Sequence, residues 1–466
     1  MSAEDHRFDY DLAVIGGGSA GFAAARTAAA EGLQTAVIEG GNEIGGLCIL
    51  RGCMPTKALL YAAEVMHLAT HPQPWGIRAE KVSFDFEQVM ARKHALVKEC
   101  ADYRRQQLLE GKFKFIRAMA RFADAHALEL KPGGKLTARS VLIATGSTFA
   151  PSPLPQLDRL DCLNSDTALQ LSRLPQSLIL LGCGAVAVEF AQFFARFGVQ
   201  VTMVQRSPHI LREFDIDAAA ELEKVLRREG ITLYTGTRLL DARRAGPQKE
   251  VAFEHDGQIV RVQAEEVLNA LGRVPNLGSL GLDQAGVQVE SGRIVTDLHM
   301  QTSQPHIYAA GDCTGPYEIV HIAIQQAEIA AYNLAHPPRQ KQMDYRLLTE
   351  IVFTEPQVAV VGLTEKQARA RGIRYDVATY PFNDHGKSLI MEARDGFVKL
   401  LADPTTGEIL GGACVGPAGG ELIHEIIAAM AGRMTVHELA ALPHYHPTLA
   451  EIWTYPAEEL AGRIPV

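Results

Sequence analysis

The stretch YDLAVIGGGSAG, Tyr10–Gly21, decides the fold of the first part of the chain. Its apolar first half predicts a buried parallel strand over Tyr10–Ile15. Glycines in the spacing G-x-G-x-x-G follow at Gly16, Gly18 and Gly21, and an alanine-rich segment after them predicts a helix. Such glycines permit a tight turn and let the backbone approach a pyrophosphate at the helix N-terminus. The stretch therefore predicts a dinucleotide site.

The residues after this helix strengthen that prediction. Thr35–Glu39 predicts a second strand, and Glu39 is its last residue. An acidic side chain at this place accepts hydrogen bonds from the ribose of an adenosine. The acid and the glycine spacing together are far more specific than the glycines alone.

A pair of cysteines follows, in GGLCILRGCMPTK, Gly45–Lys57. In a regular helix, Cys48 and Cys53 would lie about 7.5 Å apart along the axis. A disulfide accepts roughly 4.4–6.8 Å between its Cα atoms, so a bond between them requires the backbone to curl. Gly52 and Pro55 suit a bend that leads into a helix. Disulfides inside cells are more often catalytic than structural, so the pair is a candidate redox site.

A second strand, glycine loop and helix begin at Ser177–Leu181. Gly182 and Gly184 follow this strand, and Ala187 stands in place of the third glycine. The next strand is expected over Gln200–Val204. Two such units in one chain predict two dinucleotides.

The end of this second unit bears on the choice of cofactor. NAD sites carry Asp or Glu there, whereas this chain has Gln205 followed by Arg206, with Arg212 further on. A guanidinium pairs well with a 2′-phosphate, which a carboxylate would repel. The sequence favours NADPH, and NAD(H) with Arg206 as a solvated surface residue is the alternative.

Length and composition exclude several classes. A chain of 466 residues points to roughly two to four domains. The net charge of −9 argues against a nucleic-acid partner, and no apolar run is long enough to span a membrane. Seven cysteines and an acidic N-terminus do not suggest secretion, so a cytoplasmic location is expected. No metal site is predicted.

The pattern Gly-Gly-x-Cys-x4-Cys-x-Pro-Thr-Lys at Gly45–Lys57 resembles the active-site segment of the FAD-dependent pyridine nucleotide-disulfide oxidoreductases, and the likeness extends over nearly the whole chain. The resemblance implies an α/β fold with two Rossmann-like, three-layer ββα dinucleotide-binding domains and a C-terminal α+β dimerisation domain. The expected bounds are 1–150 and 273–343 for the two parts of the FAD domain, 151–272 for the NAD(P) domain, and 344–466 for the interface domain.

The resemblance also implies roles for single residues. Cys48 would be the interchange thiol and Cys53 the thiol nearer the flavin, beside an ion pair between Lys57 and Glu189. Asp312 would hydrogen-bond the ribityl chain at the end of a strand over 307–312. Further flavin-site residues are carried by the Ala-Thr-Gly that ends an expected strand over 140–147, by the G-R-x-P-N link and by the Gly-Asp pair, namely Thr145, Gly146, Gly272, Arg273 and Gly311.

The motif HPTLAE, His446–Glu451, predicts the acid–base group. The interchange thiol must lose a proton to attack, and the leaving thiolate must gain one. An imidazole does both near neutral pH, and a carboxylate orients it and stabilises its cation. His446 is the expected base and Glu451 its partner. In the family this base reaches the dithiol from the other subunit, so the resemblance implies a homodimer.

Several functions remain open. A dihydrolipoamide dehydrogenase-like enzyme leads, acting on a small disulfide or dithiol or on a lipoyl-carrying protein. Glutathione reductase-like and mercuric reductase-like enzymes are alternatives, although mercuric reductase uses a further cysteine pair near its C-terminus and the last cysteine here is Cys414. From another class, the chain could be a flavin-bearing assembly subunit of a multienzyme complex. Arg51, between the two cysteines, is predicted to lower the pKa of the thiols.

Overall fold

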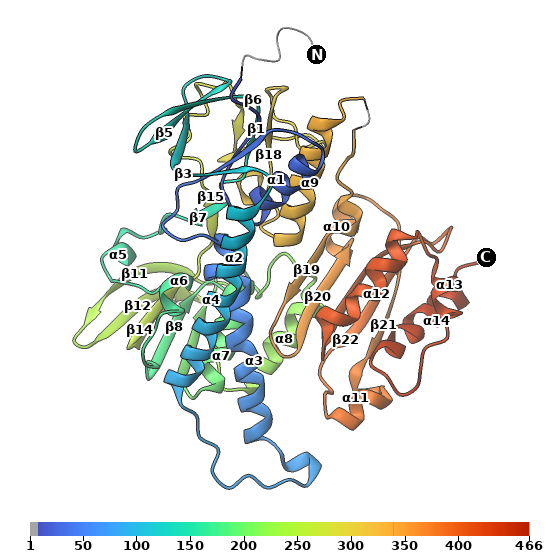
Figure 1. The fold of residues 1–466 in the computed structure, drawn as a ribbon. Helices are drawn as coiled ribbons and strands as arrows, with labels where there is room; N and C mark the ends of the chain where they lie inside the picture. The colour runs from blue at the N-terminus through green and yellow to red at the C-terminus, as the bar shows by residue number, and fades with distance from the viewer. Residues whose placement is uncertain (1–7, 339, 466) are drawn as a thin grey trace. The chain divides into compact units, whose positions relative to one another are not determined.

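The computed structural model describes residues 8–338 and 340–465 (Figure 1). By its internal contacts, the chain divides into two compact units. The first unit comprises Met1–Pro55, Ala91–Pro151 and Gly272–Met343. The second unit comprises Thr56–Met90, Ser152–Leu271 and Asp344–Val466. Each unit therefore consists of three separate segments of the chain.

The first unit is built on a seven-stranded sheet in the order β3-β2-β1-β6-β5-β4, with β18 beside β6. The strands β3, β2, β1, β6 and β18 run parallel, and the β4–β5–β6 edge is antiparallel. Two small two-stranded sheets accompany it. The bounds are β1 (Tyr10–Ile15), β2 (Thr35–Glu39), β3 (Lys114–Arg117), β4 (Met119–Phe122), β5 (Ala127–Lys131), β6 (Lys135–Ile143), β7 (Ser147–Phe149), β15 (Arg273–Pro275), β16 (Val289–Glu290), β17 (Arg293–Ile294) and β18 (Ile307–Ala309).

The centre of this sheet is apolar on both faces, as parallel strands require. Leu12, Ala13 and Val14 of β1 are fully buried. Two helices, α1 (Ser19–Ala30) and α9 (Val320–Ala335), pack against each other along their length. The alanines of α1 permit this close approach because they bring no bulk to the contact. The result is a rigid platform from which the glycine loop after β1 projects.

The second unit contains three sheets. A parallel sheet has the order β10-β9-β8-β14, and an antiparallel one the order β11-β12-β13. The bounds are β8 (Ser177–Leu181), β9 (Gln200–Val204), β10 (Thr232–Tyr234), β11 (Arg238–Ala245), β12 (Gln248–His255), β13 (Gln258–Ala264) and β14 (Glu266–Asn269).

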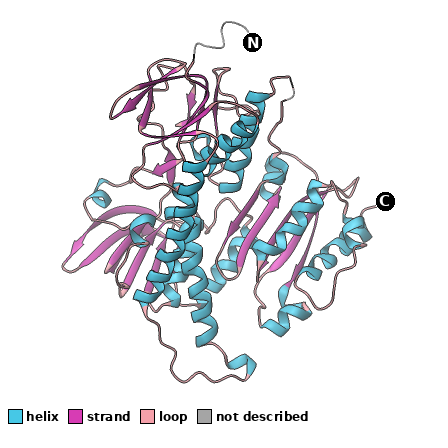
Figure 2. Cartoon of the chain, viewed as in Figure 1, coloured by secondary structure: helices cyan, strands magenta, loops and turns pink. Residues whose placement is uncertain are grey.

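The third sheet of this unit is antiparallel, in the order β19-β20-β23-β22-β21, and helix α12 (Gly419–Ala431) packs on it (Figures 1 and 2). Its core includes the fully buried Trp453, whose indole N–H donates to the carbonyl of Leu422 at 3.1 Å. The bounds are β19 (Thr349–Val352), β20 (Gln357–Gly362), β21 (Asp376–Pro381), β22 (Phe397–Ala402) and β23 (Ile409–Gly416).

The remaining helices complete the description. They are α2 (Gly46–Arg51), α3 (Cys53–Thr70), α4 (Phe86–Glu110), α5 (Pro155–Asp158), α6 (Ser165–Ala168), α7 (Ala185–Arg196), α8 (Ile216–Arg228), α10 (Glu365–Ala370), α11 (Gly386–Met391), α12 (Gly419–Ala431), α13 (Val436–Ala440) and α14 (Thr454–Arg463). Short 3-10 helices are η1 (Gln73–Trp75), η2 (Asp312–Thr314), η3 (Tyr345–Leu347), η4 (Phe382–Asp384) and η5 (Ala450–Trp453). Within 8–338 and 340–465, no helix has the length and apolar character needed to cross a bilayer.

The predicted α/β class and the four strands of the two glycine-loop units are confirmed, but two predicted strand ends are wrong. The strand expected over 140–147 ends at Ile143, because Gly146 has φ +67° and turns the chain. The strand expected over 307–312 ends at Ala309, because Gly311 has φ +81° and Asp312 opens the 3-10 helix η2.

Candidate active site

The first glycine loop is held by contacts that only glycine permits. Gly16 has φ +108°, and a Cβ there would lie 2.3 Å from the carbonyl oxygen of Ala144. A Cβ at Gly21 would lie 1.8 Å from the carbonyl oxygen of Gly16. Atoms that are not bonded to each other never approach so closely, so strand and helix meet backbone to backbone. The N-cap of α1 is Gly18, and no side chain caps this end of the helix, as a pyrophosphate site needs.

Glu39, at the end of β2, closes this loop from the side. Its Oε2 accepts from the backbone N–H of Gly17 at 2.7 Å, and its Oε1 accepts from that of Gly41 at 2.6 Å. Charge-assisted bonds of this kind are stronger than neutral ones. Sequence reasoning placed the carboxylate beside a ribose but did not foresee that it also fixes the two loops around it.

A second group of predicted residues in the first unit forms one hydrogen-bonded chain. Arg273 donates from Nε to the Ser147 hydroxyl oxygen at 2.9 Å, and Ser147 donates to Oδ2 of Asp312 at 2.7 Å. The Arg273 guanidinium also lies 4.8 Å from the centroid of the Phe149 ring. Gly146, Gly272 and Gly311, at the turns of these segments, all have positive φ.

The two cysteines lie at the junction of two helices. Cys48 is in α2 and Cys53 begins α3, while Gly52 between them has φ −126° and ψ −111° and belongs to neither. The predicted bend at Gly52 is confirmed. Both cysteines are half-buried. Arg51 forms an ion pair with Glu43, so a carboxylate offsets its charge.

A different arginine of the first unit acts electrostatically on Cys48. Burial lowers the pKa of the Arg104 guanidinium, and the charge of a Cys48 thiolate raises it again. A guanidinium and a thiolate attract each other, so the two side chains are electrostatically coupled. The Arg104 guanidinium lies 4.2 Å from the centroid of the Phe22 ring. Sequence reasoning missed Arg104, because it lies in the long polar helix α4 with no motif around it.

In the second unit, Lys57 and Glu189 form the ion pair that the resemblance implies. Lys57 Nζ lies 3.0 and 2.9 Å from the two carboxylate oxygens of Glu189, whose side chain is only 4% exposed. Oε1 of Glu189 also accepts from the backbone N–H of Phe353 at 2.9 Å. Lys57 Nζ lies 4.5 Å from the Phe353 ring centroid. The lysine is thus fixed by a carboxylate and an aromatic face.

The second glycine loop repeats the geometry of the first at its start. Gly182 has φ +99°, and a Cβ there would lie 2.6 Å from the carbonyl oxygen of Ala270. A Cβ at Gly184 would meet nothing within 4 Å, so the start of α7 is open to a ligand. Arg206 follows β9 and is exposed. Arg212 pairs through Nε with Glu213 at 2.6 Å, so the two predicted arginines differ in their surroundings.

His446 and Glu451 also come together. His446 Nδ1 lies 2.9 Å from Oε2 and 3.1 Å from Oε1 of Glu451. The histidine side chain is 76% exposed and that of the glutamate 10%. A mostly buried carboxylate therefore holds one nitrogen of an imidazole whose ring stays open to solvent. His444 is paired separately, with its Nε2 at 2.6 Å from Oε1 of Glu425.

Comparisons with known proteins identify the family. Residues 10–327 match the model of the pyridine nucleotide-disulphide oxidoreductases, and residues 348–457 match the dimerisation domain of the same proteins. The chain belongs to the pyridine nucleotide-disulphide oxidoreductase family. The resemblance inferred from the sequence is confirmed, and with it the fold class of two dinucleotide-binding domains and a dimerisation domain.

Curated relatives point to two activities within the family. The chain is 34% identical to a dihydrolipoyl dehydrogenase of Bacillus subtilis over 95% of its length and 96% of that protein. It is 34% identical to a mercuric reductase of Bacillus cereus over 88% of its length and 64% of that protein. Among solved structures, LpdA from Mycobacterium tuberculosis has a TM-score of 0.86 at 30% identity, covering 96% of this chain and 99% of that one.

The HOCl-induced flavoprotein disulfide reductase RclA from Escherichia coli has the same TM-score, 0.86, at 26% identity and with coverage of 96% of this chain and 99% of that one.

The family binds FAD and a pyridine nucleotide, and the first unit fits the flavin. Besides the bare glycine loop, the hydroxyl oxygen of Thr145 is buried there with no hydrogen-bond partner among the described residues. Such an orphan polar atom beside the crossing of Gly16 and Ala144 is what a cofactor would satisfy.

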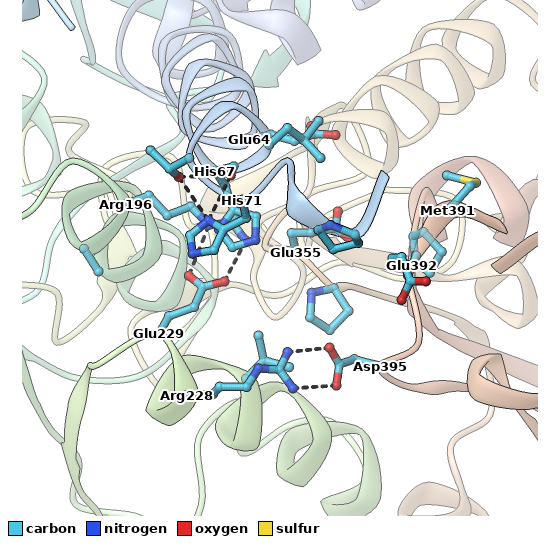
Figure 3. Close-up of a pocket in the computed structure, with 18 of the residues that line it drawn as sticks. Glu64, His67, His71, Arg196, Arg228, Glu229, Glu355, Met391, Glu392 and Asp395 are labelled. Carbon is cyan, nitrogen blue, oxygen red and sulfur yellow. Dashed lines mark hydrogen bonds and ion pairs between the residues drawn. The ribbon is translucent and has the colours of Figure 1, made fainter. Parts of the chain in front are cut away.

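A cavity of about 830 Å³ lies in the second unit, and none of the predicted site residues lines it (Figure 3). Its wall carries two ion pairs, Arg196–Glu229 and Arg228–Asp395, whose side chains are drawn in Figure 3. The rings of His67 and His71 stack at 4.4 Å. Burial lowers the pKa of His67 to about 4 and raises that of Glu355 to about 8, so both side chains are predominantly neutral near pH 7.

Proposed function

We propose that this chain is a homodimeric flavoprotein disulfide oxidoreductase, closest in activity to a dihydrolipoamide dehydrogenase. It would move electrons between a pyridine nucleotide and a small disulfide or dithiol through FAD and the pair Cys48 and Cys53. The observation that carries the proposal is the exposed imidazole of His446 held by the carboxylate of Glu451. An electron-transfer or assembly role alone gives no reason for such a group.

The reduction of a disulfide would begin at Cys48. Its thiolate attacks one sulfur of the substrate, the substrate S–S bond breaks, and the leaving thiolate takes a proton from His446. Cys53 loses its proton and then attacks the sulfur of Cys48, the Cys48–substrate S–S bond breaks, and the Cys48–Cys53 disulfide forms. The second substrate sulfur leaves as a thiolate and takes up the proton that Cys53 lost. Glu451 keeps His446 oriented and stabilises its cation between the two proton transfers. Arg104 favours the attacking thiolate.

Residues of both units would hold the cofactors. Bound FAD supplies two-electron transfer between the nicotinamide and the Cys48–Cys53 disulfide. Gly16, Gly18, Gly21 and Glu39 hold its adenosine diphosphate portion, and Thr145, Gly146 and the chain Arg273–Ser147–Asp312 hold its other half. Lys57, kept in place by Glu189, presents a positive charge from the same helix that begins with Cys53.

NADPH is the nucleotide we propose, bound at Gly182 and Gly184. Gln205 leaves the end of β9 without a carboxylate, and Arg206 is exposed there. Arg212 is a weaker candidate for the 2′-phosphate because Glu213 already engages it. Against this stands the resemblance to dihydrolipoyl dehydrogenases, which typically use NAD.

The substrate would be a small dithiol or a lipoyl group carried by a protein. Reduction of glutathione disulfide or of mercuric ion is the second candidate, which the mercuric reductase relatives favour. A flavin-bearing assembly subunit is the third. The first two candidates differ in the substrate that the enzyme turns over, and the third predicts no turnover with any of these substrates.

An anaerobic titration of the yellow holoenzyme with NADPH, and in parallel with NADH, tests the proposal. A long-wavelength absorbance band at the two-electron stage is expected, because a Cys53 thiolate then faces oxidised flavin. The matched control is Cys48→Ser, which keeps Cys53 but cannot form the Cys48–Cys53 disulfide. Bleaching of the flavin without the band would show that the cysteines are not a redox pair. Turnover with dihydrolipoamide, glutathione disulfide and mercuric ion then separates the three candidates.

A further inference from the structure

A second histidine contacts the carboxylate of Glu451. His385 Nε2 lies 3.4 Å from Oε1 of Glu451, an oxygen that His446 Nδ1 also approaches, at 3.1 Å. The His385 side chain is completely buried. The Nε2 atom makes no well-aligned hydrogen bond to any described residue, so the carboxylate is its nearest charged partner. Glu451 thus lies between a solvent-exposed imidazole and a buried one.

The other nitrogen of His385 fixes which nitrogen carries the proton. Nδ1 lies 2.7 Å from the hydroxyl oxygen of Ser388, in the first turn of α11. If the Ser388 hydroxyl donates to Nδ1, the proton of the neutral ring is on Nε2 and points at Glu451. The opposite tautomer would aim a lone pair at a carboxylate, which is repulsive. Burial lowers the pKa of His385, against the opposing charge of Glu451, so the neutral ring is favoured.

The surroundings keep this ring in place. His385 packs edge-on against Phe382 and Tyr455, with ring centroids 6.3 Å apart in both cases. Its neighbour Gly386 lies against the acid–base histidine, because a Cβ there would be 3.8 Å from Cε1 of His446. The segment that carries His385 therefore lies beside both members of the proposed acid–base pair: His385 contacts Glu451, and Gly386 lies next to His446.

Few other ionisable groups face the two imidazoles. Tyr455 comes from α14, and its ring stacks on Tyr380 of β21 at 4.0 Å. Burial and the neighbouring Asp384 raise the pKa of Tyr380 to about 12, so it stays neutral over the working range. The Asp384 carboxylate accepts from the Tyr380 hydroxyl at 3.1 Å. Glu451 is the charged group on which both imidazoles converge.

We propose that His385 is a positioning residue of the acid–base site, whose neutral Nε2–H is directed at the Glu451 carboxylate 3.4 Å away, so that His385 and His446 share this carboxylate. The inference rests on the proposed roles of His446 and Glu451. A second N–H directed at this carboxylate disperses its negative charge. His446 then gives up its proton more readily than it would if the Glu451 carboxylate had no contact with His385.

Removal of this donor should therefore raise the pKa of His446. In His385→Phe, the buried carboxylate keeps a single imidazole partner, and we expect an upward shift of about half a unit to one unit. His385→Gln is the matched control, because its side-chain amide can place an N–H near the position of Nε2. It should leave the pKa of His446 within roughly 0.2 units of the starting protein.

The measurement is a pH titration of histidine resonances in holoenzyme labelled at histidine Cε1, with His446 assigned from the signal missing in His446→Gln. An unchanged or lowered His446 pKa in His385→Phe would overturn the inference, as would the same shift in His385→Phe and His385→Gln. If the shift in His385→Phe came only from lost packing, His385→Gln would not be expected to restore the pKa of His446. If His385→Phe does not fold, Ser388→Ala decides, with a smaller upward shift expected and no shift contradicting the inference.

The pH profile of turnover separates this inference from the proposed function. If His446→Gln leaves turnover intact, the proposed base is wrong even where the resonance shift is observed. If His446→Gln abolishes turnover and the resonance of His446 ignores position 385, the base stands and the role of His385 falls. With both correct, the acid limb of the profile moves to higher pH in His385→Phe and stays in place in His385→Gln.

Discussion

The two glycine loops begin alike and then diverge. At their first glycines, Gly16 and Gly182, the backbone has φ +108° and +99°, and a Cβ would collide with the carbonyl oxygen of Ala144 or Ala270. Both following helices are capped by a glycine in extended conformation. The crossing of strand and loop is thus a fixed requirement of the motif in either unit.

Three features beyond that first glycine differ between the loops. In the first loop, Gly17 packs against Glu39, and a Cβ there would lie 3.2 Å from Oε2, whereas the second loop buries the side chain of Cys183. The third glycine, Gly21, has no room for a Cβ, whereas Ala187 occupies its place in the second loop. The acid that closes the first loop has no counterpart at the end of β9. The comparison teaches that the first loop is tightened around its ligand and the second is looser.

Gly21→Ala should have the largest effect. A Cβ 1.8 Å from the carbonyl oxygen of Gly16 forces helix and strand apart, so we expect loss of FAD and a destabilisation of more than about 3 kcal/mol. The matched change in the second loop, Ala187→Gly, should cost only about 1 kcal/mol. Flavin content and thermal unfolding measure both. Equal effects of the two substitutions would show that the loops are equally tight.

Glu39→Gln should have the next largest effect. Both carboxylate oxygens accept backbone N–H groups, and an amide can replace only one of them. We expect the Kd for FAD to rise about 10- to 100-fold, since a charge-assisted bond contributes roughly 1.5–3 kcal/mol. Rebinding of FAD to the apoprotein measures it, and Gln205→Ala, at the matched position, should leave it unchanged. A Kd unaltered in Glu39→Gln would remove the claim that the acid tightens the first loop.

Arg206→Ala sharpens the comparison at the end of β9. Loss of a guanidinium partner for the 2′-phosphate should raise KM for NADPH about 10-fold and leave that for NADH unchanged. Steady-state kinetics with both nucleotides measure the effect. Arg212→Ala is the control, because that guanidinium already pairs with Glu213. Equal changes for the two nucleotides would mean that Arg206 does not read the phosphate.

Cys183→Ala should have the smallest effect on stability, and this effect should depend on pH only at high pH. Burial raises the pKa of the Cys183 thiol above its unfolded value, so the folded chain keeps a proton that the unfolded chain loses. That difference costs stability as pH rises above about 9, by roughly 1.4 kcal/mol per unit. The variant lacks this loss, so its disadvantage relative to the parent should shrink between about pH 8 and 10. Chemical unfolding at both pH values measures it, and a constant difference would contradict the assignment.

The sequence predicted the parts of the fold that depend on local pattern. The strands β1, β2, β8 and β9 agree to the residue, because each is an apolar run bounded by glycine or polar residues. The predicted strand ends near Thr145 and Asp312 were wrong. Gly146 and Gly311 adopt positive φ, and whether such a glycine ends a strand depends on the segments that pack beside it.

The same limit applies to the site. His446 and Glu451 could be paired from one short motif, whereas Lys57 and Glu189 could be paired only through the family resemblance. Arg104 and His385 were missed, because their significance lies in the residues that folding brings to them. His385 belongs to a turn between β21 and α11 whose sequence resembles no catalytic pattern, and only its contact with Glu451 draws attention to it.

The discontinuous first unit has a consequence for the growing chain. The strand β18 pairs with β6 from the segment Gly272–Met343, after most of the second unit's nucleotide-binding part has been made. During synthesis, β6 therefore lacks this neighbour while that part emerges and folds. Contacts between segments so distant in sequence form slowly, and an open strand edge invites wrong pairing in the meantime. The order in which the ribosome delivers the chain thus makes the flavin-binding sheet the last nucleotide-binding sheet to be completed.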